Sequence, residues 1–116
     1  MTKYDKLFNV KVRNAKQIFH DCVKLILVAL LKEKHKNTEI YTEYNPSNPN
    51  DSYADIYIKL KDWTYIFEIQ KEISESWLKQ IQEKYDLPKT DLIVIPLKDL
   101  PTDINELTKK LNEFVI

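Results

Sequence analysis

Apolar positions near the start of the chain recur with helical spacing. From Asn14 to about Lys36 they fall three and four residues apart, at Ala15, Ile18, Phe19, Cys22, Val23, Ile26 and Leu30. This spacing predicts a helix with one apolar face, on which Cys22 is a small core residue. The stretch 22–31 is apolar nearly all round. We therefore expect it to be buried on two sides or to lie at a subunit interface.

Strand patterns fill the middle of the chain. Residues 38–44, 53–60 and 64–71 are rich in Ile, Tyr, Phe and Thr, which favour strands. Between the first two, residues 45–52 read Asn-Pro-Ser-Asn-Pro-Asn-Asp-Ser, which is typical of a loop throughout. The second and third are separated by a polar break at Lys61-Asp62 and predict a β-hairpin.

The C-terminal part of the chain predicts a helix, a strand and a second helix. Ser74 is a suitable N-cap for a helix over about 75–85, which Pro88 ends and whose inward positions are Trp77, Leu78, Ile81 and Tyr85. The continuous apolar run 92–95 suits a strand buried on both faces. Asp103 caps a last amphipathic helix through Leu107, Leu111 and Phe114. The order αβββαβα predicts one α/β domain over residues 1–116, with helices on both faces of a mixed four-stranded sheet.

Composition narrows the class of protein. With 43% hydrophobic and 31% charged residues, the chain reads as an ordinary globular domain rather than a disordered or membrane protein. Its longest apolar run, Leu25–Leu31, is too short to span a bilayer, and the N-terminus lacks the apolar core of a secretory signal. A single cysteine excludes an intramolecular disulfide and a cysteine-based zinc cluster. We expect a cytoplasmic protein without a membrane partner.

Charge and glycine content limit the function further. The chain has 18 basic and 18 acidic residues, whereas nucleic-acid-binding proteins are more often basic. Opposite charges can still gather on opposite faces. Glycine is absent from the sequence, so a phosphate-cradling loop of the P-loop or dinucleotide type is excluded. His20 and His35 are fifteen residues apart and form no metal-spaced pair, so we expect each to be a core or surface histidine.

Two carboxylates stand out in the predicted hairpin. Asp55 and Glu68 lie among Ile, Tyr and Phe in adjacent strands, where acidic residues are uncommon, and Gln70 follows the glutamate by two positions. A two-residue turn at Lys61-Asp62 would place Asp55 opposite Glu68, and a turn shifted by one residue would place it opposite Gln70. A three-residue turn would place Asp55 opposite Ile69 and separate the acids.

Two interpretations of this pair are open. Hard oxygen ligands on neighbouring strands suit Mg²⁺, whose remaining positions are filled by water and substrate phosphate. The alternative is a pair of solvated acids on the exposed face of an antiparallel sheet.

The element order and the motif Ala54-Asp55, twelve residues, Glu68-Ile69-Gln70 resemble the PD-(D/E)xK nuclease superfamily. This core is shared by restriction endonucleases, archaeal Holliday-junction resolvases and RecB-like exonucleases, and the resemblance covers residues 14–97. The Asp-to-Glu interval is similar to that of the resolvases, and residues 68–74 are similar to CoiA-like nucleases. The sequence departs from the family pattern at Ala54 in place of proline and Gln70 in place of lysine. The first helix also has no glutamate before Glu33.

The resemblance implies Mg²⁺- or Mn²⁺-dependent hydrolysis of duplex or branched DNA, by a homodimer. The metal ligands would be Asp55, Glu68 and the backbone carbonyl of Ile69, with Gln70 orienting water or phosphate. Possible accessory residues are Asp21, Glu43, Lys71, Lys79 and Gln80. The alternative is a nuclease fold with a degenerate site that acts as a nucleic-acid-binding or protein-interaction adaptor.

Overall fold

The computed structural model describes residues 17–44 and 54–116. Its elements follow the predicted order αβββαβα, with a short 3-10 helix added before the last helix. They are α1 (Ile18–Lys34), β1 (Ile40–Tyr44), β2 (Ala54–Leu60), β3 (Trp63–Gln70), α2 (Glu75–Lys84), β4 (Thr90–Pro96), η3 (Leu97–Asp99) and α3 (Ile104–Asn112). The predicted loop 45–52, residues 14–16 of the predicted first helix and Tyr53 lie outside the described residues.

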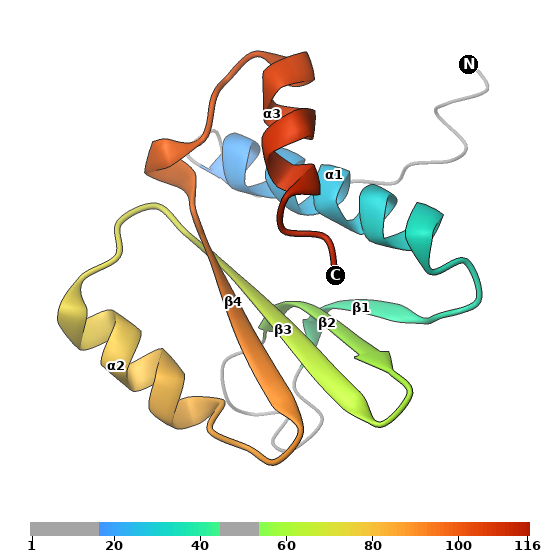
Figure 1. Cartoon of the computed structure of the whole chain (residues 1–116). Coiled ribbons are helices and arrows are strands. Elements are labelled where there is room, and N and C mark those ends of the chain that lie inside the picture. Colours follow the sequence, from blue (N-terminus) through green and yellow to red (C-terminus); the bar gives the residue numbers. More distant parts are fainter. Residues whose placement is uncertain (1–16, 45–53) are drawn as a thin grey trace.

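The four strands form one mixed sheet in the order β1-β2-β3-β4. The pairs β1–β2 and β2–β3 are antiparallel, and β3–β4 is parallel because α2 carries the chain back between them. As Figure 1 shows, α1 and α3 lie together on one side of the sheet while α2 lies apart from them beside β4. The described structure is therefore an α/β fold with helices on both faces, as the sequence predicts.

Two apolar clusters hold these layers together. The larger cluster joins the sheet to α1 and α3; its fully buried members are Val23, Leu27, Leu31, Ile56, Ile58, Phe67, Ile95 and Leu111. Val23, Leu27 and Leu31 are four residues apart, so they form one stripe along α1. A smaller cluster joins α2 to the opposite face through Ile66 and Tyr85. The sheet is thus covered on both faces along its central strands.

The helix caps follow the predicted chemistry. Ser74 Oγ accepts a hydrogen bond from the Trp77 N–H at 3.1 Å, and Asp103 Oδ2 accepts one from the Glu106 N–H at 3.1 Å. Such caps satisfy backbone donors that the first helical turn leaves unpaired.

Two packing predictions are wrong. Cys22 is exposed rather than part of the core, because the buried stripe of α1 runs through Val23 and its partners. In the run 92–95 only Ile95 is buried, and Leu92 to Val94 are half-buried. The reason is that, among the described strands, β4 lies at the edge of the sheet and pairs with β3 alone.

The β2–β3 hairpin has the even turn that the site requires. Leu60 pairs with Trp63, so the turn consists of Lys61 and Asp62 alone. Lys61 has a φ of 58°, in the left-handed region that glycine usually occupies in tight hairpins. Because the sequence has no glycine, a lysine takes this conformation instead.

Candidate functional site

Asp55 lies at a break in the hydrogen-bonded ladders on both sides of β2. Towards β1, the register pairs Ile56 with Thr42 and Ala54 with Tyr44, but it passes over Glu43, whose φ is 52°. Towards β3, the register ends at Ile56 paired with Phe67, and one step further Asp55 would face Glu68. The strands β2 and β3 therefore separate at the positions of Asp55 and Glu68.

The Asp55 carboxylate replaces the missing strand pairing. Its Oδ2 accepts a hydrogen bond from the Ile69 N–H at 2.7 Å, a short charge-assisted contact between side chain and backbone. Its Oδ1 lies 3.3 Å from Nε2 of His20 on α1. The side chain thus reaches from the opening between β2 and β3 to the first helix, and the bond to Ile69 holds it in place.

Glu68 is the buried member of the pair. It is only 9% exposed, and the Tyr85 hydroxyl donates a hydrogen bond to its Oε1 at 2.9 Å. Burial, and next the negative charge of Asp55, raise the pKa of Glu68 from 4.5 to about 7, although the Tyr85 bond acts in the opposite direction. Two neighbouring carboxylates repel each other when both are ionised, so the doubly ionised pair is unfavourable unless a positive charge binds between them.

A second acidic group lies on α1 behind Asp55. His20 Nδ1 is 3.3 Å from Oδ1 of Asp21, so the imidazole bridges Asp21 and Asp55. The hydrogen bond to Asp55 raises the pKa of His20 above 6.5, against the opposing effect of burial. Asp21 is 7% exposed, and its Oδ2 has no hydrogen-bond partner within the described residues. An unpaired buried carboxylate oxygen is costly, because desolvation is not compensated there.

Lys24 connects this group to the first strand. Its Nζ lies 3.7 Å from Asp21 Oδ1 and 3.4 Å from Glu43 Oε1. A line of acidic and basic side chains therefore runs from Asp55 on β2, through His20, Asp21 and Lys24 on α1, to Glu43 on β1. Of the predicted accessory residues, Asp21 and Glu43 belong to this line.

The other predicted residues lie around it. Gln70 is half-buried at the last position of β3, where it pairs with Pro96 of β4. Lys71 is exposed immediately after the strand, and Lys79 and Gln80 are exposed on α2. The structure thus gathers the acidic candidates, while these basic and amide candidates remain at the surface or rim.

Three residues of the site were not predicted as such: His20, Lys24 and Tyr85. His20 and Lys24 are four residues apart, so they share a face of α1 next to the apolar stripe. The spacing of these two polar residues is the signal in the sequence that could have identified them as site residues. The position of Tyr85 at the inward end of α2 was predicted, but its bond to Glu68 depends on how α2 crosses the sheet, which local pattern does not encode.

The donor set is suited to a hard divalent cation. Asp55 and Glu68 supply carboxylate oxygens, and Ile69 can add its carbonyl oxygen, which are ligand types that Mg²⁺ and Mn²⁺ accept. Among the described residues, no group of three or more His, Cys, Asp or Glu side chains is arranged to hold a metal ion. A cation at this pair would therefore take its remaining ligands from backbone, water or substrate.

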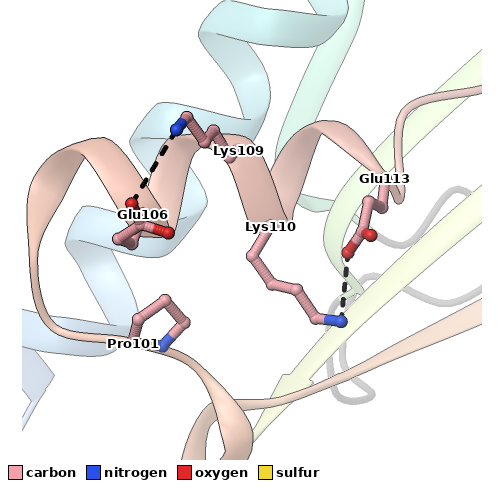
Figure 2. Close-up of a pocket in the computed structure, with 5 residues that line it drawn as sticks. All are labelled: Pro101, Glu106, Lys109, Lys110 and Glu113. Carbon is pink, nitrogen blue, oxygen red and sulfur yellow. Dashed lines mark ion pairs between the residues drawn. The ribbon is translucent and has the colours of Figure 1, made fainter.

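A shallow hollow beside α3 is a weaker candidate (Figure 2). Pro101, Glu106, Lys109, Lys110 and Glu113 line it. Its charges form pairs along the helix: Lys109 Nζ lies 3.8 Å from Glu106 Oε1, and Lys110 Nζ lies 3.0 Å from Glu113 Oε2. Exposed pairs of this kind are common on helix surfaces and indicate no chemistry.

Comparison with family models, curated proteins and solved structures gives no match for this chain. Within residues 17–44 and 54–116, no helix has both the length and the apolar character needed to cross a membrane. Fold and site together define an α/β protein with a carboxylate pair, buried Glu68 and half-buried Asp55, at a break in its sheet.

Proposed function

We propose that this protein is a Mg²⁺- or Mn²⁺-dependent DNA endonuclease with a restriction-endonuclease-like core of the PD-(D/E)xK type. The observation that carries the proposal is the convergence of Asp55 and Glu68 across the hairpin, at the point where β2 and β3 separate. The αβββαβα order and the mixed sheet agree with such a core.

The electrostatics of the pair favour a cation. Glu68 has a pKa of about 7 because it is buried beside the Asp55 charge. A divalent ion between them would compensate both charges and displace the proton of Glu68. When bound, such an ion lowers the pKa of an attacking water and offsets the charge that develops on the phosphate.

The protein groups around the pair have distinct roles in this proposal. Asp55 and Glu68 hold the ion, with the Ile69 carbonyl as a third ligand. The Ile69 N–H and the Tyr85 hydroxyl orient the two carboxylates, one each. Gln70, at the end of β3, orients water or phosphate.

A second candidate function is an adaptor with the same fold and a degenerate site. The observation in its favour is that Asp55 also terminates the β2–β3 pairing, so its presence has a structural reason apart from catalysis. Gln70, in place of a lysine, supplies no positive charge for the phosphate. In this case nucleic acid or a protein would bind without being cleaved.

Titration calorimetry with Mn²⁺ tests the metal site first. The unmodified protein should bind the ion, and Asp55→Ala and Glu68→Ala should abolish binding. Asp91→Asn is the matched control, because Asp91 is an exposed strand carboxylate on β4. Absence of binding at millimolar Mn²⁺, or binding unchanged by Asp55→Ala, refutes the enzyme.

Cleavage assays then separate nuclease from adaptor. Plasmid nicking and cutting of a four-way junction, each with Glu68→Ala as control, should show metal-dependent hydrolysis. Metal binding with no cleavage of either substrate favours the adaptor. A two-fold dimer and a cytoplasmic location remain predictions, and sedimentation of the purified chain tests the first.

A further inference from the structure

A pocket of about 520 Å³ opens at the hairpin end of the sheet, away from the carboxylate pair. Its walls come from the β2–β3 hairpin and from the segment where α1 ends and β1 begins. Leu60 and His35 line it, together with Lys61, Trp63 and Tyr65. Trp63 is 38% exposed, which is unusual for so large an apolar side chain.

The basic and aromatic residues of this pocket have a regular spacing. Lys61, Trp63 and Tyr65 occupy alternate positions, so the two rings project from the same face of β3. At about 3.4 Å per strand residue, the rings stand roughly 7 Å apart along the strand. That face also carries Phe67 and Ile69 of the larger core cluster, and Tyr65 packs partly against them, so Trp63 is the more exposed ring at the hairpin end. An exposed aromatic ring next to a basic residue is a typical stacking surface for the bases of a single strand.

The charge of the pocket suits a phosphate-bearing ligand. Lys61 is exposed at the turn, where its ammonium group is available to a ligand. The neighbouring Asp62 is the acidic residue of the pocket, and its Oδ2 lies 2.7 Å from Nζ of Lys89. Because this pair is neutral as a whole, the positive charge of Lys61 is not cancelled locally.

We propose that this pocket binds unpaired bases of single-stranded nucleic acid. A base stacks on the exposed indole of Trp63, the Tyr65 ring supports a second contact, and Lys61 binds the adjoining phosphate. The choice of nucleic acid as the ligand rests on the proposed function. The pocket is separated from Asp55 by the length of β2, roughly 17 Å for five residues. The preferred substrate would then carry unpaired nucleotides at about that distance from the cleaved bond.

Tryptophan fluorescence without divalent metal tests the pocket independently of catalysis. The chain has two tryptophans, so Trp77→Phe leaves Trp63 as the only indole. Titration of this protein with an oligothymidine of eight nucleotides should quench Trp63 in a saturable and salt-dependent way. In the same background, Tyr65→Leu should weaken binding about tenfold, within the range measured for loss of one stacked base.

Lys61→Asn gives a second variant that spares the fold, because asparagine tolerates the positive φ of this turn. It should weaken binding several-fold and reduce the dependence on salt. Lys98→Asn, an exposed lysine of η3, is the matched control and should bind normally. Absence of quenching, or equal weakening by the control, refutes the pocket. Quenching without cleavage in the nuclease assays leaves the pocket standing and refutes only the enzyme. Cleavage without quenching supports the enzyme and refutes only the pocket.

Discussion

Replacing Glu68 by glutamine should stabilise the metal-free protein at neutral and alkaline pH. Burial and the Asp55 charge raise the pKa of Glu68 from 4.5 to about 7. The native state therefore binds this proton more tightly than the unfolded state, and stability falls as pH rises between those two values. At about 1.4 kcal/mol per pKa unit, ionised Glu68 costs the native state about 3 kcal/mol above pH 7.

Glutamine removes this cost while retaining the contacts. Its amide oxygen can still accept the Tyr85 hydroxyl, and its NH₂ group can donate to Asp55. At about pH 4, where Glu68 is mostly protonated in both states, the variant and the unmodified protein should be nearly equally stable. At about pH 8 the variant should be more stable by about 3 kcal/mol.

Urea unfolding followed by tryptophan fluorescence measures this difference at pH 4, 6 and 8. The urea dependence should be the same for both proteins, since both expose the same surface. Millimolar Mg²⁺ should then reverse the order at pH 8, because it stabilises only the protein that binds it.

Two results would refute this reasoning. A variant no more stable than the unmodified protein at pH 8 would mean that Glu68 carries its charge without cost. A gain that is constant from pH 4 to 8 would have a cause other than ionisation. Asp91→Asn controls for loss of a strand carboxylate, because Asp91 is exposed, and should show no pH-dependent gain.

Three further predictions concern the groups around the pair. Asp55→Ala should lower the free energy of unfolding by about 1–3 kcal/mol even without metal, because the Ile69 N–H loses its acceptor. Asp55→Asn keeps an acceptor, so it should lower the free energy of unfolding by less in the same denaturation experiment. Tyr85→Phe removes the hydroxyl that favours ionised Glu68, so calorimetry should show Mn²⁺ binding weakened several-fold at pH 7, with little change at pH 9. Folding raises the pKa of His20 above 6.5, so the protonated imidazole stabilises the native state below pH 6.5. This contribution is lost as the pH rises through the pKa that His20 has in the folded protein. Thermal melts of His20→Gln should therefore show destabilisation at about pH 5.5 and much less at about pH 9.

Local signals in the sequence were sufficient for the order of the helices and strands and for the helix caps. Ser74 and Asp103 mark helix starts because their side chains satisfy backbone donors next to them in the chain. The polar break at Lys61-Asp62 predicts the hairpin but leaves the length and position of its turn open. The structure pairs Leu60 with Trp63, a register that would place Asp55 opposite Glu68. The caps and the hairpin depend on residues a few positions apart, so they need no tertiary information, whereas the exact turn had to come from the structure.

The surroundings of the pair were not predictable in the same way. His20 was expected to be an ordinary core or surface histidine, yet it lies between Asp21 and Asp55 because of how α1 crosses the sheet. The break at Glu43 has no sequence marker, since a glutamate rather than a glycine adopts the positive φ. Tertiary contacts and unusual backbone conformations of this kind determine the charge environment of Asp55 and Glu68. The pattern of apolar positions in the sequence predicts neither the contacts nor the conformations.

The hydrogen bond from the Ile69 N–H to Asp55 affects how position 55 should be interpreted in homologues. Because the carboxylate completes the backbone pairing of β3, selection for folding alone would keep an acceptor at this position whether or not the site is active. An aspartate or asparagine at position 55 in a homologue is therefore no evidence of an active enzyme. Glu68 is the more informative position, because its ionised form opposes folding even though it accepts the Tyr85 hydrogen bond. Under the proposed function, retention of this glutamate in a homologue would indicate that the homologue still binds a cation.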